Sequence, residues 1–322
     1  MNIYFSNNDF LRTFRSFLES VNFSKENILK ITTHNKWTNV HPAGLVLAAA
    51  LALKAGKQNS WIDQNVPVSV GYLDRMGLYN YLSTTSPFSH HEKEPTGRFI
   101  PITVVKTDQD QSRFISDMIP LLHLPPDKSD IIKYIVGELI RNVLEHAQAK
   151  HGAIVAAQYF PKSNRISIGI CDTGIGIWRS MHETWQPKND IEAIKMALTP
   201  GITGTTRREG GTSDNAGAGL FFIKSIAKMA RSYFVIYSGR GEYSLLKYDK
   251  RVKTLPRLYA DPELDHHRES NALPNFQGTL IGVDISLDSN AEFNSILEAI
   301  KKAYEESIRD RKRLRYKEPK FI

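Results

Sequence analysis

The sequence predicts an α/β protein built from two main parts. Apolar residues at helical spacing alternate along the chain with short alternating or β-branched apolar runs, as in α/β folds. A stretch rich in Ser, Thr, Pro and charge, residues 83–98, favours a boundary between residues 1–95 and residues 96–290. A basic helix and tail, residues 291–322, would follow. The 322 residues, 41% hydrophobic and 24% charged, suffice for two ordinary cores.

Composition excludes several classes of protein. No apolar run reaches the roughly 18 residues of a membrane span, since the longest, Gly44–Leu53, ends at Lys54. The single cysteine, Cys171, permits neither an internal disulfide nor a cysteine metal cluster. The first residues, MNIYFSNNDF, lack the basic start and apolar segment of a signal peptide. We therefore expect a cytoplasmic protein that makes no membrane contact.

Residues 1–95 predict a small α/β unit. Its clearest element is a helix at His41–Gly56, because Pro42 suits a first helical turn and Gly56 suits a helix end. The other elements expected here are a helix at residues 8–20, strands at 28–32 and 66–70, and a helix at 71–82.

Residues 96–290 predict a larger α/β unit around one long helix, at about residues 128–150. A short connection, PKSN, joins two apolar runs and predicts a hairpin. Strands are expected at 99–105, 153–160, 165–172, 233–239, 242–249 and 278–287, and further helices at 190–197, from 217 or 219 to 231, and at 291–315. The remainder of 173–216 and residues 256–277 are expected to be irregular.

The long helix carries an acid and an amide one turn apart. Glu138 and Asn142 are four residues apart, so they lie on one stripe, at the border of the apolar face. A half-buried border position allows such side chains to face a ligand while packing anchors the helix. Taken alone, the pair is explained by solvated side chains on an ordinary amphipathic helix, so it is informative only together with the motifs that follow.

The run ICDTGIGI ends a strand in an acid. Asp172 shares the parity of three alternating isoleucines, so it is expected on the apolar side, where a carboxylate needs hydrogen-bond donors. Gly174 and Gly176 permit positive φ and a close approach of the backbone to a flat ligand. The amino group of an adenine would satisfy this carboxylate. An Asp-Thr-Gly turn with no ligand explains the same residues.

Two further glycines precede the next helix. Gly217 and Gly219 leave bare amides at a helix N-terminus, which favour a phosphate group. The glycine-rich stretch 199–217 before them suits a mobile lid, although a loop with a glycine-capped helix is the alternative. Thr279, at the start of the last strand, could hold the same base as Asp172.

In this order the four motifs resemble the GHKL ATPase superfamily, most closely its histidine-kinase-like ATPase domains, over about residues 100–290. The resemblance implies an α/β sandwich of the Bergerat type that binds ATP and Mg²⁺. By position, Asn142 would bind the metal and Glu138 would be the general base. Asp172 would accept from the adenine amino group, helped by Thr279 through a water. The remaining assignments are Gly174 and Gly176 to the adenine pocket, and Gly217 and Gly219 to the phosphates. No P-loop motif occurs.

The first part is similar to STAS-like domains in two runs, HPAGLVLAAALAL and VSVGYLDRMGLYNYL. Those domains place a phosphorylatable Ser or Thr where this chain has Ala43, so the resemblance implies a docking or regulatory unit. A sensor kinase would need a helical hairpin with a phosphoacceptor histidine, a pattern that residues 1–100 do not show.

Three functions remain open at this stage. The first is a nucleotide-dependent switch that hydrolyses ATP or transfers phosphate to a partner protein, as anti-sigma-type serine kinases do. The second is a nucleotide-binding regulatory module without turnover. The third is nucleic-acid binding through the basic run Arg309–Lys320, which the net charge of +8 allows. A protein partner and a homodimer are both compatible with the sequence.

Overall fold

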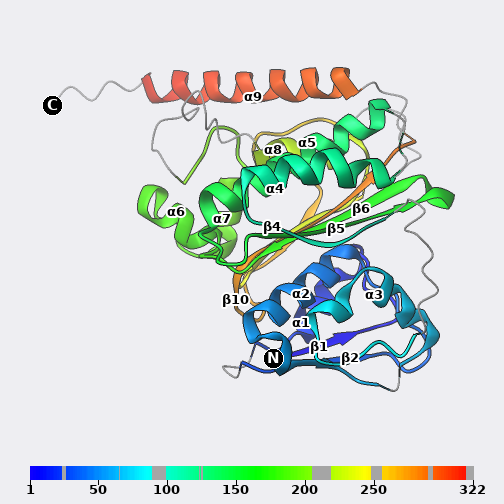
Figure 1. The fold of residues 1–322 in the computed structure, drawn as a ribbon. Coiled ribbons are helices and arrows are strands. Elements are labelled where there is room, and N and C mark those ends of the chain that lie inside the picture. Colours follow the sequence, from blue (N-terminus) through cyan, green and yellow to red (C-terminus); the bar gives the residue numbers. More distant parts are fainter. Residues whose placement is uncertain are drawn as a thin grey trace.

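The structure, a computed structural model, describes residues 1–23, 27–64, 66–88, 99–122, 124, 126–204, 219–247, 256–288 and 293–316. These residues form a mixed α/β fold with a seven-stranded and a three-stranded sheet. Figure 1 shows the larger sheet in the middle of the molecule, with helices above it and the N-terminal elements below it.

The seven-stranded sheet is antiparallel throughout, and its central strand is the last in sequence. In spatial order its strands are β4 (Phe99–Val105), β5 (Ala153–Phe160), β6 (Arg165–Asp172), β10 (Phe276–Ser286), β7 (Phe234–Gly239), β8 (Gly241–Leu245) and β9 (His267–Ser270). The six strands predicted within residues 96–290 are therefore confirmed, although β8 ends at Leu245, before the predicted limit of 249. The short edge strand β9 is an addition in a stretch that we expected to be irregular. The pairing of β10 with β6 places Thr279 opposite Asp172.

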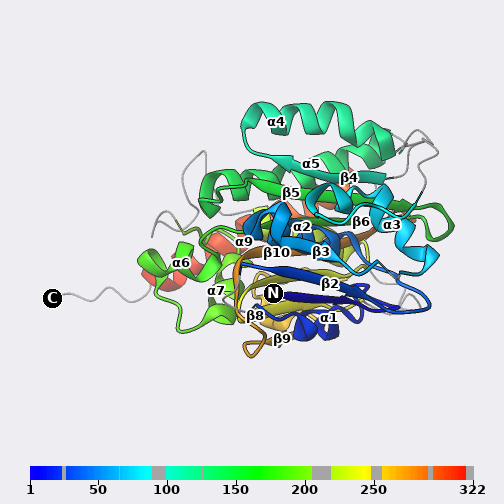
Figure 2. The ribbon, with the colours of Figure 1, turned by 60° about the horizontal axis from the view of Figure 1, so that its bottom comes forward.

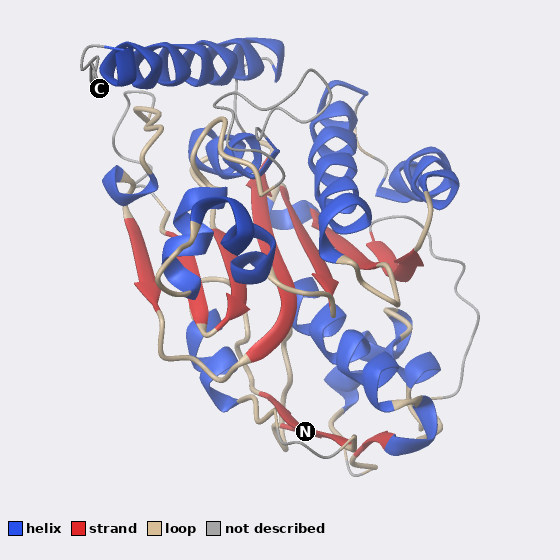
Figure 3. Ribbon diagram, turned by 90° about the vertical axis from the view of Figure 1, so that its left-hand side faces the viewer, coloured by secondary structure: helices blue, strands red, loops and turns tan. Residues whose placement is uncertain are grey.

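Helices cover the upper face of this sheet. The helices α5 (Pro126–Asn142) and α8 (Gly219–Met229) pack their apolar sides on isoleucines of β6, and α9 (Phe293–Tyr316) packs across both helices. The small helix α4 (Asp108–Arg113) continues into single turns at Phe114–Met118 and Ile119–Leu122. At one end of the sheet lie α6 (Ile177–Trp185) and α7 (Asp190–Ala197), which face the viewer in Figure 3.

The long helix differs from its prediction at the C-terminal end. The α-helical turns stop at Asn142, and a π-helical turn follows at Val143–Ala147. Single π turns inside helices often mark functional sites because they shift the side chains beyond them. None of the described helices is long and apolar enough to cross a membrane.

The N-terminal part contains a parallel sheet in the order β1 (Asn2–Phe5), β2 (Leu29–Thr33) and β3 (Ser60–Ile62). Its helices are α1 (Phe14–Ser20), α2 (Pro42–Ala55) and α3 (Gly71–Arg75), with 3₁₀ turns at Lys57–Asn59, Val68–Val70 and Leu78–Tyr81.

Two predictions in this part are wrong. Residues 68–70 form a 3₁₀ turn and no strand, because Pro67 lacks a backbone donor and its carbonyl accepts from the N–H of Val70. The helix expected at 71–82 breaks at Gly77, whose φ of +80° is left-handed, and a 3₁₀ turn replaces its second half. The helix expected from residue 8 begins at Phe14.

The helix α2 packs on the lower face of the large sheet, against β5, β6 and β10 (Figure 2). Two glycines that pair across β6 and β10, Gly169 and Gly282, leave a bare patch for its first turn. A Cβ on Gly169 would lie 2.4 Å from the backbone nitrogen of Ala43. The core beneath the sheet joins side chains of residues 1–82 to Ile154, Cys171, Tyr237 and Leu280. Both faces of the sheet are therefore covered.

A buried polar cluster fixes this contact. The imidazole of His41 caps α2 by accepting from the N–H of Ala43 at its Nδ1 (3.0 Å), so Nε2 carries the hydrogen and donates to Asp284 (3.3 Å). Ser167 and Arg165 of β6 also contact this carboxylate. Burial alone raises the pKa of Asp284, but His41, Arg165 and Ser167 together outweigh it and leave the pKa below its ordinary value.

Candidate functional site

A pocket of about 320 Å³ opens at the end of β6, beneath α5 and α8 and beside α6. Six of the residues predicted for the site line it: Glu138, Asn142, Asp172, Gly176, Gly219 and Thr279. Gly174 is not among the lining residues, and Gly217 lies outside the described residues. The structure therefore brings together side chains that are separated by up to 141 residues along the chain, from 138 to 279.

Asp172 forms the deep wall of the pocket. The residue is 2% exposed, and its carboxylate accepts hydrogen bonds from the N–H of Gly174 (2.7 Å) and from Thr279. Burial raises the pKa of Asp172 to about 7, against the lowering effect of these donors. A carboxylate held in this way gains from a further donor, such as the amino group of a heterocycle.

The turn after β6 requires its glycines for close packing. A Cβ on Gly174 would lie 1.9 Å from the carbonyl oxygen of Ala147, which ends the π turn and accepts from the N–H of Ile175 (2.8 Å). Gly176 has a φ of +79°, and a Cβ there would lie 3.0 Å from the hydroxyl of Ser238. Gly174 thus fits the end of α5 against the turn, while Gly176 borders the pocket.

Ser238 on β7 is a supporting residue that the sequence analysis missed. Its hydroxyl accepts from the N–H of Ile177 (3.0 Å) and donates to the carbonyl of Gly278 (2.7 Å). It therefore connects the first residue of α6 to the beginning of the strand segment that carries Thr279. No local sequence signal identifies a serine in a buried strand as such a link.

The opposite wall is formed by α5 and the N-terminus of α8. A Cβ on Gly219 would lie 3.0 Å from Oε2 of Glu138 and 3.3 Å from Nδ2 of Asn142. Burial raises the pKa of Glu138, the ion pair with Arg141 (2.8 Å) lowers it, and nearby Glu145 raises it, with a net upward shift. A carboxylate with a raised pKa beside a helix N-terminus suits proton acceptance near neutral pH.

The residues of this wall fit a magnesium ion bound together with phosphates. The Nδ2 atom of Asn142 is buried and has no hydrogen-bond partner among the described residues. This amide can turn its oxygen toward the pocket. Among the described residues no cluster of three or more His, Cys, Asp or Glu side chains could hold a metal. One amide oxygen with phosphate oxygens and waters matches the preferences of Mg²⁺.

A second set of missed residues holds the segment 200–204, which forms the rim of the pocket. Trp185 and Thr184 of α6 donate to the carbonyls of Thr203 (2.7 Å) and Gly204 (2.6 Å). Arg311 of α9 donates to the carbonyl of Pro200. The predicted lid, residues 199–217, includes this segment, and its residues 205–217 lie outside the described residues. The helix α6 could have been suspected from Ile177 and Met181, which are four apart.

The comparison with protein families agrees with this geometry. Residues 111–234 match the model of the histidine kinase-like ATPase domain. The matched range includes Glu138, Asn142, Asp172 and Gly219, while Thr279 lies beyond it. No curated protein and no solved structure matches the chain. This match supports the GHKL-type ATPase prediction for the second part of the chain and, with it, ATP binding; the STAS-like resemblance of the first part stays a prediction.

Proposed function

We propose that this protein binds Mg-ATP in the pocket between Asp172 and Asn142 and acts as a nucleotide-dependent switch in the cytoplasm. One observation carries the proposal: a buried carboxylate with spare acceptor capacity and an amide whose buried Nδ2 has no partner among the described residues face the same cavity from opposite walls. The first satisfies an amino-purine and the second a metal-bound phosphate. The match to the histidine kinase-like ATPase domain supports this assignment.

The arrangement orients the nucleotide from adenine to phosphate. The adenine amino group donates to Asp172, and Thr279 assists from the paired strand. The phosphates extend toward Gly219, where the N-terminus of α8 favours an anion. Asn142 holds magnesium, which, when bound, supplies positive charge to the phosphate oxygens. A side chain at Gly219 would enter the space beside Glu138 and Asn142, where the phosphates would lie.

Turnover would depend on Glu138. A water or a partner's serine hydroxyl attacks the γ-phosphorus, a new P–O bond forms, and the bond to the β–γ bridging oxygen breaks to release ADP. The carboxylate of Glu138 accepts the proton of the attacking oxygen. The raised pKa of Glu138 matches this task. A partner protein, or a second copy of the chain, would then sense whether ATP or ADP is bound.

The N-terminal part would act as the regulatory unit, whether or not its STAS-like resemblance holds. Its helix α2 packs against β6 through Gly169, three residues before Asp172 on the same strand.

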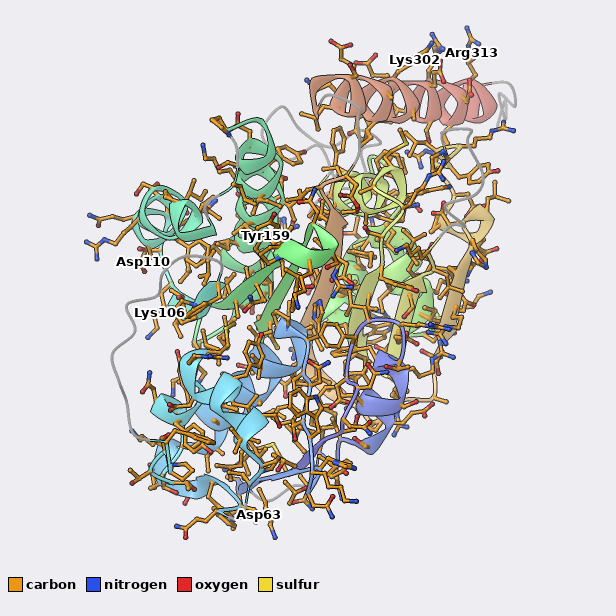
Figure 4. The ribbon with its side chains drawn as sticks, turned by 90° about the vertical axis from the view of Figure 1, so that its right-hand side faces the viewer. Asp63, Lys106, Asp110, Tyr159, Lys302 and Arg313 are labelled. Atoms are coloured by element: carbon orange, nitrogen blue, oxygen red, sulfur yellow. The ribbon has the colours of Figure 1, made fainter. Side chains whose placement is uncertain are left out.

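Nucleic-acid binding through Arg309–Lys320 has less support than nucleotide binding. The described part of this run belongs to α9, and one side of α9 packs on α5 and α8. Lys302 and Arg313 of α9 point away from the body of the molecule (Figure 4).

The test is the Glu138→Gln variant, compared with Glu145→Gln, which neutralises another acid of the same pocket. We expect Glu138→Gln to keep or strengthen ATP binding, because a negative charge near the phosphates is lost. Phosphate release or transfer should fall about 100-fold or more, as expected for loss of a general base. In the control, the rate of phosphate release or transfer should stay within about threefold of the wild type, because Glu145 is not the proposed proton acceptor.

These measurements also separate two classes of protein. Equal rates for Glu138→Gln and the wild type would remove Glu138 from catalysis. A wild type that binds ATP but shows neither release nor transfer, with and without candidate partner proteins, would identify a regulatory nucleotide-binding module without turnover.

A further inference from the structure

The mouth of the pocket carries an ion pair. Arg141 lies between Glu138 and Asn142 on α5, and its Nη1 is 2.8 Å from Oε1 of Glu138. The side chain of Arg141 is 52% exposed, whereas that of Glu138 is 20% exposed. All three residues line the pocket. The guanidinium therefore lies at the solvent side and the carboxylate at the pocket side of the same contact.

The charges of the pocket wall do not suit a triphosphate unless a cation takes part. The described lining residues include three acids, Glu138, Glu145 and Asp172. The positive side chains among them are Arg141 and, only when protonated, His146. A triphosphate adds about four negative charges, of which one magnesium ion offsets two. A guanidinium stays charged at every physiological pH and binds phosphate oxygens with two parallel N–H groups.

A second ion pair on α5 provides an internal comparison. Lys133 and Asp130 are also three residues apart, with Nζ 3.0 Å from Oδ1, and their side chains are 44% and 60% exposed. Neither residue lines the pocket. Exposed pairs of this kind contribute little to helix stability. The Arg141–Glu138 pair differs because its acid is largely buried and faces the site where the phosphates would be held.

We propose that Arg141 binds the terminal phosphates of the nucleotide directly and exchanges its partner from Glu138 to phosphate when the triphosphate enters. This inference rests on the proposed function and adds a residue to it. Arg141 and Asn142 both line the pocket, and the guanidinium already contacts Glu138 there, so phosphates held by the amide lie within its reach. The exchange also releases the carboxylate of Glu138 to accept a proton. Arg141 thereby distinguishes a triphosphate from shorter ligands.

Calorimetric titration with ATP, ADP and adenosine, each in Mg²⁺, tests this inference on the full chain. Arg141→Gln should weaken ATP about 10- to 100-fold, the range for a charge-assisted hydrogen-bonded contact, and ADP less. Adenosine should bind as it does to the wild type. Arg141→Lys should recover part of the loss, because it keeps the charge but not the paired N–H groups. The matched control, Lys133→Gln, should leave all three affinities within about twofold.

The Glu138→Gln background separates direct contact from simple neutralisation. If Arg141 touches phosphate, Arg141→Gln still weakens ATP in a protein that already carries Glu138→Gln. If the loss disappears there, Arg141 merely neutralises Glu138 and the inference is overturned. Equal losses for adenosine and ATP would indicate a structural role and overturn it too. A wild type that binds ATP, with Arg141→Gln unchanged, contradicts this inference alone, whereas a wild type that binds none of the three removes the proposed function with it.

Discussion

The burial of Asp172 lowers the stability of the nucleotide-free protein and favours the binding of a hydrogen-bond donor. Its carboxylate is buried at the end of a strand, and the hydrogen bonds from Gly174 and Thr279 do not offset the loss of water, so its pKa rises to about 7. In the unfolded chain the same group ionises near its ordinary value of 3.8. Ionised Asp172 therefore destabilises the empty protein, and a ligand donor would recover that free energy.

The pH dependence of this effect has a defined sign. Because the folded-state pKa is raised, the contribution of Asp172 to stability is fully present below about pH 4 and is lost as the pH rises toward 7. We predict that Asp172→Asn raises the free energy of unfolding of the nucleotide-free protein by about 2–4 kcal/mol at pH 8. At pH 4 the two proteins should differ by less than about 1 kcal/mol.

Urea denaturation of both proteins at the two pH values measures this difference. Two results would contradict this account of Asp172: a variant less stable than the wild type at pH 8, or the same difference in stability at both pH values. Either would show that burial does not destabilise the ionised carboxylate.

At this scale the sequence identified residues with a strong local signal. The parity of β6 correctly put Asp172 among buried side chains, and the helical stripe put Glu138 and Asn142 at a half-buried border. The sequence could not identify Ser238, because its role depends on a distant strand that carries Gly278. The spacing of Glu138 and Arg141 on the predicted helix allowed an ion pair, but it did not show that the pair borders the pocket. Gly174 was assigned to the pocket, whereas the structure places it against the carbonyl of Ala147.

Among the elements, α2 and the two central strands depend most closely on one another. The first turn of α2 approaches the backbone of β6 at Gly169 and that of β10 at Gly282. Contacts this close exclude any side chain at the first of these positions, since the neighbouring atoms belong to the backbone of Pro42 and Ala43. Gly169 is therefore a requirement of packing and not of a turn, whereas a Cβ at Gly282 would meet only side-chain atoms, the nearest of them of Leu11 and Ala43.

Gly169→Ala should separate α2 from the sheet. The new Cβ would lie 2.4 Å from the nitrogen of Ala43, and we predict a loss of about 2–3 kcal/mol or more in the free energy of unfolding. Gly137→Ala is the matched control, because its Cβ would meet Ile115 at an ordinary 3.6 Å and helix interiors favour Ala over Gly by about 0.5–1 kcal/mol.

Denaturation midpoints of the two variants, followed by tryptophan fluorescence, provide the measurement. Equal stability of Gly169→Ala and the wild type would contradict the close contact between α2 and β6.

The sequence predicted elements with strong periodicity well and weakly patterned ones poorly. The limits of β4, β5 and β6 agree with the predicted ranges, because apolar runs between turn residues define them. Residues 68–70 form a 3₁₀ turn although Val-Ser-Val alternates as a strand would, because the carbonyl of Pro67 accepts from the N–H of Val70. The edge strand β9 was missed because its four residues, HRES, include no apolar side chain. The helix α6 was missed although Ile177 and Met181 have helical spacing, because it lies in a stretch that is otherwise polar and rich in glycine.

On the scale of the whole molecule, the sheet is a shared wall between two cores. One face carries α5 and α8 with the pocket at its end, and the other carries α2 and the three-stranded sheet (Figure 1). The sequence predicted enough apolar residues for two cores, but it could not predict that the cores share one sheet. The two glycines that contact α2 belong to strands more than 100 residues apart in the sequence. A boundary near residue 95 therefore did not reveal that the N-terminal part packs on the sheet.

The proposed binding of Mg-ATP also depends on the whole fold, because residues of α5, β6, α6, α8 and β10 line the pocket. The most direct measurement is a calorimetric titration of Mg-ATP into the wild type and Asp172→Asn, at pH 8, where the carboxylate is ionised. We predict that the wild type binds ATP and that the variant binds at least about 30-fold more weakly, because its adenine contact loses a charged acceptor. Equal affinities of the two proteins for ATP, or no binding by the wild type, would contradict the account.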